Sequence, residues 1–275
     1  MKRKLLSVCL CALLFCGCTP QPKAPDIVAT TLPVHEFTVR LCKGSGLSVG
    51  LLIDQNVSCL HDYTLQVSQM RMLEKSKAVA VSGAGLEDFL PDLSNKNVID
   101  CSAGISLLDH GSDPHIWLSP ALAKKMAENL AEGLIKQFPN YADRITDNLQ
   151  DLELDLDKLQ SYGENALSAL PHKELITFHD GFAYFAQSFG LEIAFAIEEE
   201  PGSEVSAAKV KELVTIIRDR NIPAIFTEKN GSTASAEVIA AEAGISCYTL
   251  DMIFSDTDYF SAMYQNIDCI KEALK

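Results

Sequence analysis

The chain has 275 residues, 47% of them hydrophobic, and a formal net charge of −14 at pH 7. This length allows a large hydrophobic core and predicts two lobes or domains. The acidic balance, with no visible basic patch, argues against nucleic acid as a partner.

The first 17 residues have the pattern of an export signal. A basic run at residues 2–4 precedes an apolar run at 5–15, which is too short to span a bilayer as a stable helix. Residues 14–18 resemble a bacterial lipobox, which predicts cleavage before Cys18 and a lipid on that cysteine. The alternatives are an ordinary signal peptide or an uncleaved anchor. Residues 18–25 contain three prolines and are expected to form an extended tether.

The other cysteines of the predicted mature chain match neither a zinc ribbon nor a CxxC redox motif. An exported compartment permits disulfides, but five thiols leave at least one unpaired, and their pairing cannot be read from the sequence. They are Cys42, Cys59, Cys101, Cys247 and Cys269.

Residues 26–138 alternate between strand and helix patterns. This alternation predicts an N-terminal lobe with a parallel sheet wrapped by helices, in which ligands gather at the carboxyl ends of the strands. A tight turn is expected at Gly83-Ala84-Gly85. The expected strands are 26–31, 49–53, 78–82 and 98–100, and the expected helices are 34–42, one that ends near residue 75, and 120–137.

Residues 139–171 form the longest periodic run, with apolar residues recurring at helical spacing between Pro139 and Pro171. About thirty helical residues reach roughly 45 Å, which is enough to join two lobes. Gly163 is the one weak point of this helix. A coiled-coil segment is the alternative interpretation.

Residues 172–275 resume the alternation and predict a second α/β lobe. His179, Glu228 and Asp251 each lie at the end of an expected strand. The expected strands are 174–178, 192–197, 224–227 and 246–250, and the expected helices are 182–189, 206–218, 235–243 and 258–274.

The stretch from Asp113 to Pro120 contains the only tryptophan of the chain. Pro114 holds His115 just after a fixed turn, and Ser119 with Pro120 predicts a helix start. A histidine on such a stiff loop is well placed to be a ligand. The alternative is a core histidine beside a buried tryptophan.

Four residues form a candidate metal site, two from each half of the chain. Three imidazoles and one carboxylate suit a divalent transition metal, although the separations match no short motif. The candidates are His61, His115, His179 and Asp251, with Asp62, Tyr63, Asp180 and Glu228 as supporting or substitute ligands. The remaining histidines, His35, His110 and His172, are interpreted as surface or loop residues.

These motifs resemble the metal-binding extracytoplasmic solute-binding proteins of bacterial ABC importers for zinc and for manganese or iron, specifically the zinc-uptake type of cluster A-I. The resemblance implies two α/β lobes joined by one rigid helix, with metal held between the lobes by His61, His115, His179 and Asp251. Its pieces, in order, are His61-Asp62-Tyr63, the segment 83–87, the segment 113–120, the segment 177–182, the segment 204–207, the segment 225–228 and the segment 249–251.

Two departures from that family bear on the metal. Cys59-Leu60 stands where the family usually has an Asp-Pro or similar pair, and no histidine-rich loop lies between His61 and His115. The missing loop weakens a zinc assignment, and a histidine at the third position occurs in zinc and in manganese or iron binders. We expect Zn²⁺, with Mn²⁺ or Fe²⁺ as the alternatives, because the ligand set suits zinc and zinc stands higher in the Irving–Williams order.

The resemblance implies a non-enzymatic receptor that delivers metal to an ABC permease. We expect a monomer in the periplasm or on the outer face of the cytoplasmic membrane, lipid-anchored and binding no nucleic acid. One alternative is a zinc hydrolase with Glu228 as general base, against which no HExxH helix is present and four ligands leave no water position. Another is a surface adhesin.

The rigid helix predicts that metal binding moves the lobes only a little. The expected mobile parts are the loops carrying His179 and Asp251, with His61 and His115 held by the N-terminal lobe.

Overall fold

The computed structural model describes residues 24–54, 63–108, 113–198, 205–229, 231, 233–254 and 257–275. The predictions for the signal peptide, Cys18, Cys59, His61 and Asp62 therefore lie outside the described residues. In the described part, the alternation of strands and helices follows the sequence-based expectation element by element.

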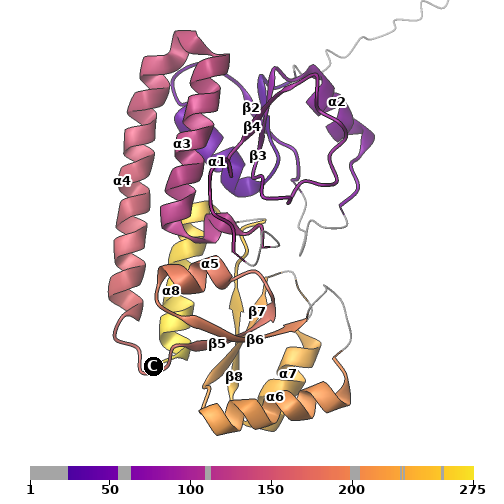
Figure 1. Cartoon of the computed structure of the whole chain (residues 1–275), viewed down its shortest axis with the longest axis vertical. Coiled ribbons are helices and arrows are strands. Elements are labelled where there is room, and N and C mark those ends of the chain that lie inside the picture. The colour runs from indigo at the N-terminus through magenta and orange to yellow at the C-terminus, as the bar shows by residue number, and fades with distance from the viewer. Residues whose placement is uncertain are drawn as a thin grey trace, which may run out of the picture.

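The N-terminal lobe contains a four-stranded parallel sheet in the order β2-β1-β3-β4. Helices lie around it because each buries one apolar face against the sheet or a neighbouring helix (Figure 1). The strands are β1 (Ile27–Ala29), β2 (Val49–Leu51), β3 (Ala78–Val81) and β4 (Asn97–Asp100), and the helices are α1 (Leu32–Leu41), α2 (Val67–Lys75) and α3 (Pro120–Gln137).

The C-terminal lobe contains a second four-stranded parallel sheet, in the order β6-β5-β7-β8. The two sheets confirm the predicted fold class. The strands are β5 (Glu174–His179), β6 (Glu192–Glu198), β7 (Ala224–Glu228) and β8 (Ser246–Leu250), and the helices are α5 (Ala183–Ser188), α6 (Ala207–Arg220), α7 (Ala234–Ala243) and α8 (Tyr259–Ala273).

One long helix, α4 (Ala142–Leu167), runs along both lobes (Figure 1). It contacts α1 and α3 on the N-terminal side and α8 on the C-terminal side. The short 3-10 turn η3 (Pro139–Tyr141) precedes it, so the regular helix is a few residues shorter than the sequence run. The apolar stripe of α4 is buried at Ile145, Leu152, Leu156, Leu159 and Leu167.

The last helix also crosses the division between the lobes. Tyr259 of α8 packs edge-on against Phe37 of α1, with ring centroids 4.9 Å apart.

The domain limits 26–138, 139–171 and 172–275 stay a prediction. In the described part of the chain, no helix combines the length and the apolar character needed to cross a membrane, and the thiols of Cys42, Cys101, Cys247 and Cys269 are free.

Candidate metal centre

His115 lies on a buried loop between the two lobes. The loop passes through the 3-10 turn η2 (Ile116–Leu118), and the Ser119 hydroxyl then accepts a hydrogen bond from the Leu122 amide at the start of α3. Pro120 occupies the first turn of that helix, as predicted. His115 is 2% exposed and Trp117 is fully buried, so the loop is part of the core.

Asp113 fixes the orientation of the His115 ring. One carboxylate oxygen, Oδ1, accepts from the His115 backbone amide at 2.9 Å and pairs with the ring Nδ1 at 2.8 Å. With the proton on Nδ1, the lone pair on Nε2 is available to a metal ion, an arrangement common to metal-binding histidines. Asp113 was not predicted as a site residue, although its position two residues before a histidine was a usable signal.

His179 is brought beside His115 from the other lobe. It is the last residue of β5, and its ring centroid lies 5.6 Å from that of His115 at an interplanar angle of 88°. Gly181 permits this approach: an added Cβ would lie 2.5 Å from the Met252 methyl group and 3.3 Å from the His115 ring. Segments carrying three of the four predicted ligands therefore converge here.

Asp251 follows β8 directly and is 8% exposed. The Asn266 side chain holds its backbone on both sides, since it accepts from the Asp251 amide and donates to the Asp251 carbonyl, each at 2.8 Å. The carboxylate oxygen Oδ1 accepts from the Ile253 amide at 2.7 Å. Ile253 has a φ of 66°, a left-handed conformation that costs a β-branched residue on the order of 1–3 kcal/mol.

Hydrogen bonds from the C-terminal lobe also hold the His115 loop. Trp117 Nε1 donates to the Met252 carbonyl at 3.0 Å, and the Tyr259 hydroxyl donates to the Trp117 carbonyl at 2.7 Å. The Tyr184 hydroxyl donates to the Asp113 carbonyl at 3.1 Å. These contacts show that residues of the C-terminal lobe hold the His115 loop as well, whereas the expected mobility of the loops that carry His179 and Asp251 stays a prediction.

The remaining predicted residues that the structure describes lie on three separate segments. Glu228 is the buried last residue of β7, Asp180 is exposed after β5, and Tyr63 is half-buried ahead of α2. Lys229, which the sequence-based prediction missed, contacts Asp251 Oδ2 at 3.2 Å.

Within the described ranges, no group of three or more His, Cys, Asp or Glu side chains is arranged to hold a metal ion. His61 is outside those ranges, so the four-residue ligand set stays a prediction.

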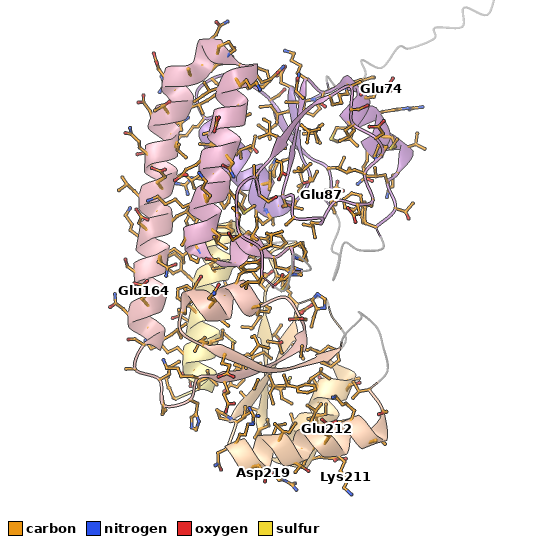
Figure 2. All side chains as sticks on the ribbon, viewed as in Figure 1. Glu74, Glu87, Glu164, Lys211, Glu212 and Asp219 are labelled. Carbon is orange, nitrogen blue, oxygen red and sulfur yellow. The ribbon has the colours of Figure 1, made fainter. Side chains whose placement is uncertain are left out.

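Glu87 organises the carboxyl ends of β1 and β3, on the side of the N-terminal sheet that faces the other lobe (Figure 2). Its Oε1 accepts from Thr30 Oγ1 at 2.6 Å and from the Ser82 amide at 2.7 Å, and its Oε2 accepts from the Gly83 amide at 3.0 Å. Burial nevertheless raises the pKa of Glu87 to about 7. Gly83 has a φ of 81°, and an added Cβ would lie 2.0 Å from Asp100 Oδ1.

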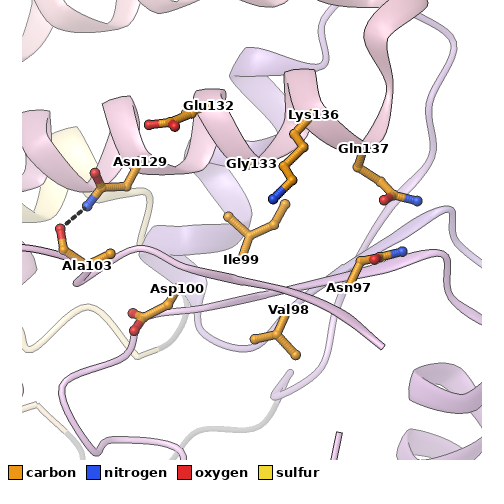
Figure 3. Close-up of a pocket in the computed structure, with 10 residues that line it drawn as sticks. All are labelled: Asn97, Val98, Ile99, Asp100, Ala103, Asn129, Glu132, Gly133, Lys136 and Gln137. Atoms are coloured by element: carbon orange, nitrogen blue, oxygen red, sulfur yellow. Dashed lines mark hydrogen bonds between the residues drawn. The ribbon is translucent and has the colours of Figure 1, made fainter. Parts of the chain in front are cut away.

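A separate hollow of about 330 Å³ lies between β4 and α3 (Figure 3). Its polar lining includes Asp100, Glu132 and Lys136, and Asn129 closes one side by donating to the Ala103 carbonyl at 2.8 Å. None of its lining residues is a histidine or a cysteine. It therefore lacks the nitrogen and sulfur donors that a zinc site uses.

Comparisons with known proteins identify similar chains. The sequence model of a family described as zinc-uptake complex component A, periplasmic, matches residues 27–273. The chain is 28% identical to the zinc-binding lipoprotein AdcA of Streptococcus pneumoniae, over 98% of this chain and 60% of that relative. It is 25% identical to the high-affinity zinc uptake system protein ZnuA of Bacillus subtilis, over 98% of this chain and 96% of that one.

A solved structure shares the fold. The Zn(II)-bound ZnuA-like domain of Streptococcus pneumoniae AdcA is 27% identical, covers 91% of this chain and 98% of its own, and superposes with a TM-score of 0.80. This chain spans about 60% of the length of AdcA, the first of the curated relatives it matches.

Proposed function

Because the chain belongs to the family of periplasmic component A proteins of zinc-uptake complexes, we propose that it is a receptor that captures Zn²⁺ outside the cytoplasmic membrane and delivers it to an ABC permease. The observation that carries the proposal is the pair of histidine rings from opposite lobes. His115 is buried with its Nδ1 directed at Asp113, and the His179 ring lies against it. Two imidazoles presented between the lobes suit capture of a divalent transition metal ion of borderline softness, such as Zn²⁺.

The proposed ligands are His61, His115, His179 and Asp251. Three neutral imidazoles and one carboxylate complete a four-coordinate shell of the kind zinc prefers. Asp113 supports His115, and Asn266 supports Asp251, through the hydrogen bonds described above. Asp180 follows His179 and Asp62 follows His61 in the sequence, and Glu228 pairs in register with Leu250, the residue before Asp251. These three are proposed to act as supporting residues.

The proposed receptor is a monomer on the outer face of the cytoplasmic membrane, held there by a lipid on Cys18. The basic–apolar–cysteine order of residues 2–18 supports this placement. A Cys18→Ala variant is expected to lose acyl labelling and to remain unprocessed or become soluble. Acyl label that persists in this variant would assign the lipid elsewhere.

The family supports transport rather than catalysis as the activity. A zinc hydrolase with Glu228 as general base is the competing class, and it requires an open coordination position for water. We expect no turnover of esters or peptides with zinc added. Measurable hydrolysis that a Glu228→Gln variant abolishes would favour the enzyme.

Metal content and ligand variants test the proposal directly. Elemental analysis of protein purified without added metal is expected to find one zinc ion per chain, and equimolar Mn²⁺ or Fe²⁺ should not displace it. His115→Ala and His179→Ala should each weaken zinc binding by orders of magnitude, because each removes one donor. His172→Ala is the matched control, since that residue precedes β5 and lies outside the proposed set. Equal zinc affinity in the His115→Ala protein would refute the site.

A further inference from the structure

Asp251 already has a cationic partner. The Lys229 ammonium lies 3.2 Å from Asp251 Oδ2 and donates to Thr257 Oγ1 at 2.8 Å. The Lys229 backbone amide donates to the Leu250 carbonyl at 2.8 Å, which extends the pairing of β7 with β8 by one residue. The lysine is therefore anchored directly beside the aspartate that we propose as a metal ligand.

The two carboxylate oxygens of Asp251 differ in how easily their partners can leave. Oδ1 is bound by the amide of Ile253, whose backbone is fully buried and left-handed, so releasing it requires the turn to rearrange. Oδ2 is bound by an ammonium on a flexible side chain that is 33% exposed. A flexible, partly exposed lysine side chain can move toward solvent, so Oδ2 is the oxygen whose partner can be exchanged.

A divalent cation and the ammonium compete for this oxygen. A carboxylate oxygen has lone pairs for two donors, but two cations held within a few ångströms of each other repel in a partly buried site. A metal ion bound at Oδ2 must therefore displace the Lys229 ammonium. If the ammonium stays beside the metal ion, the repulsion between them lowers the metal affinity.

We propose that Lys229 is a built-in counter-cation of the metal site, which neutralises Asp251 in the metal-free protein and is exchanged for the metal on binding. This inference rests on the proposed function, because it assumes that Asp251 is a ligand. It makes Lys229 a determinant of affinity and release: the ammonium returns to Oδ2 as the metal leaves, so the vacated carboxylate stays paired.

The test measures zinc affinity by competition with a chromophoric chelator at constant ionic strength. Lys229→Gln is expected to bind Zn²⁺ about tenfold more tightly, since it removes both the competing ion pair and the repulsion. Lys229→Arg keeps the charge and should stay near the wild-type affinity. Lys211→Gln makes the same charge change on α6, at the far end of the C-terminal lobe (Figure 2), and should leave affinity unchanged.

Stability of the metal-free protein provides a second readout. Lys229→Gln is expected to lower its thermal midpoint by about 1–3 °C, because Asp251 loses its counter-charge. The midpoint of the zinc-bound protein should not fall. A lower midpoint in the metal-free protein alone distinguishes exchange of Lys229 for zinc from a general loss of stability, which would lower both midpoints.

A double variant connects the effect to Asp251. In an Asp251→Asn background, the gain from Lys229→Gln is expected to shrink to less than half, because the shared oxygen no longer carries a full charge. Unchanged or weaker binding by Lys229→Gln, or an undiminished gain in the Asp251→Asn background, overturns the inference. Failure of the wild-type protein to bind zinc at all would instead overturn the proposed function.

Discussion

The Trp117 side chain contacts residues of both lobes. Its ring packs edge-on against His115 at a centroid distance of 5.3 Å and against Phe254 at 5.6 Å. Its indole N–H donates to the Met252 carbonyl, within the turn that follows Asp251. All of these groups are buried, so the indole couples the orientation of the His115 loop to that of the Asp251 turn.

Replacing Trp117 by Phe keeps an aromatic ring and removes the N–H donor. The Met252 carbonyl then loses its donor in a buried position, which is expected to lower the free energy of unfolding by about 2 kcal/mol. Zinc affinity should fall as well, because the turn that carries Asp251 is held less firmly. Urea unfolding of the metal-free protein and a zinc titration measure the two effects. Tyr162→Phe removes an exposed hydrogen bond to Asp268 and should change stability by less than about 0.5 kcal/mol. A Trp117→Phe protein as stable as the wild type would contradict this role.

Zinc affinity should depend on pH because the proposed ligands include histidine side chains. A histidine must be neutral to donate its lone pair to a metal, and protons compete for it in the range around pH ~6.5. We therefore expect the zinc dissociation constant to rise steeply between about pH 7.5 and pH 5.5. Titrations at fixed ionic strength measure this dependence, and a flat profile would argue against imidazole ligands.

Helices α1 and α8 meet at a half-buried carboxylate, that of Glu36. Glu36 Oε2 accepts from the Tyr259 amide at 2.8 Å, in the first turn of α8, where Asp258 caps the helix by accepting from the Ser261 amide. Burial, with the nearby negative charge of Asp258, raises the pKa of Glu36 to about 7, although the hydrogen bond from Tyr259 and the charge of Arg40 oppose the rise. The Glu36 carboxyl group, at this contact between the lobes, therefore changes its charge near neutral pH.

Glu36 should make the protein more stable at mildly acidic pH. Its pKa is raised on folding from 4.5 to about 7, so the folded state keeps a proton that the unfolded state releases. The stabilisation is complete below about pH 4.5 and is lost as the pH rises through about 7. Glu36→Gln should flatten this part of the stability profile, measured by chemical unfolding at several pH values. Glu74→Gln, on the exposed face of α2, is the control, and an unchanged slope in Glu36→Gln would contradict the assignment.

Gly163 lets α4 approach the C-terminal lobe. An added Cβ would lie 2.2 Å from Phe189 Cε1, and Phe189 is itself buried and packs edge-on against Phe185, with ring centroids 4.8 Å apart. The sequence pattern identified this glycine only as a weak point in a helix. The packing shows that a side chain has no space there.

Gly163→Ala should therefore destabilise the protein despite the better helix propensity of alanine. Propensity alone favours the change by about 1 kcal/mol, whereas overpacking a buried contact costs typically 1–3 kcal/mol. We expect a net loss of about 1 kcal/mol in urea unfolding, the middle of the range that these two contributions leave. Ser161→Ala, two residues earlier on the exposed face of α4, should be neutral or stabilising. A stabilised Gly163→Ala protein would show that Phe189 can move aside.

At the scale of the whole molecule, several independent connections hold the lobes together. Helix α4 packs on both, Tyr259 contacts α1, and the hydrogen bonds of Trp117 and Tyr184 cross between them. Ser188 of α5 also donates to the Ser119 hydroxyl at the start of α3, at 2.6 Å. A wide hinge closure would break most of these contacts together.

We therefore expect metal binding to change the separation of the lobes by less than roughly 10 Å, below the scale of large hinge closures. Spin labels at positions 74 and 211, on α2 and α6 at opposite ends of the molecule (Figure 2), report this separation with and without zinc. A larger shift would contradict a rigid connection. A local change near Asp251 without a change in separation would agree with exchange of Lys229 as the main response.

Most of the fold could be predicted from sequence because its signals are local. Periodicity identified α4, the Ser119-Pro120 pair identified the start of α3, and alternation of strands with helices identified both parallel sheets. His179, Glu228 and Asp251 were placed at strand ends, where the structure has them. A residue's position along an element depends mainly on its neighbours in sequence, and a single chain displays those directly.

The partners of these residues were decided by the tertiary structure. Asn266 lies inside a helix and carries no sequence signal, yet it holds Asp251 from 15 residues away. Lys229 carries no sequence signal of its own either, and its contact with Asp251 depends on the register in which β7 and β8 pair. By itself the sequence determined which elements form and which side chains stand at their ends. Which side chain faces which across 20 or 130 residues depends on how the sheets and helices pack, because such contacts form only when the whole core closes.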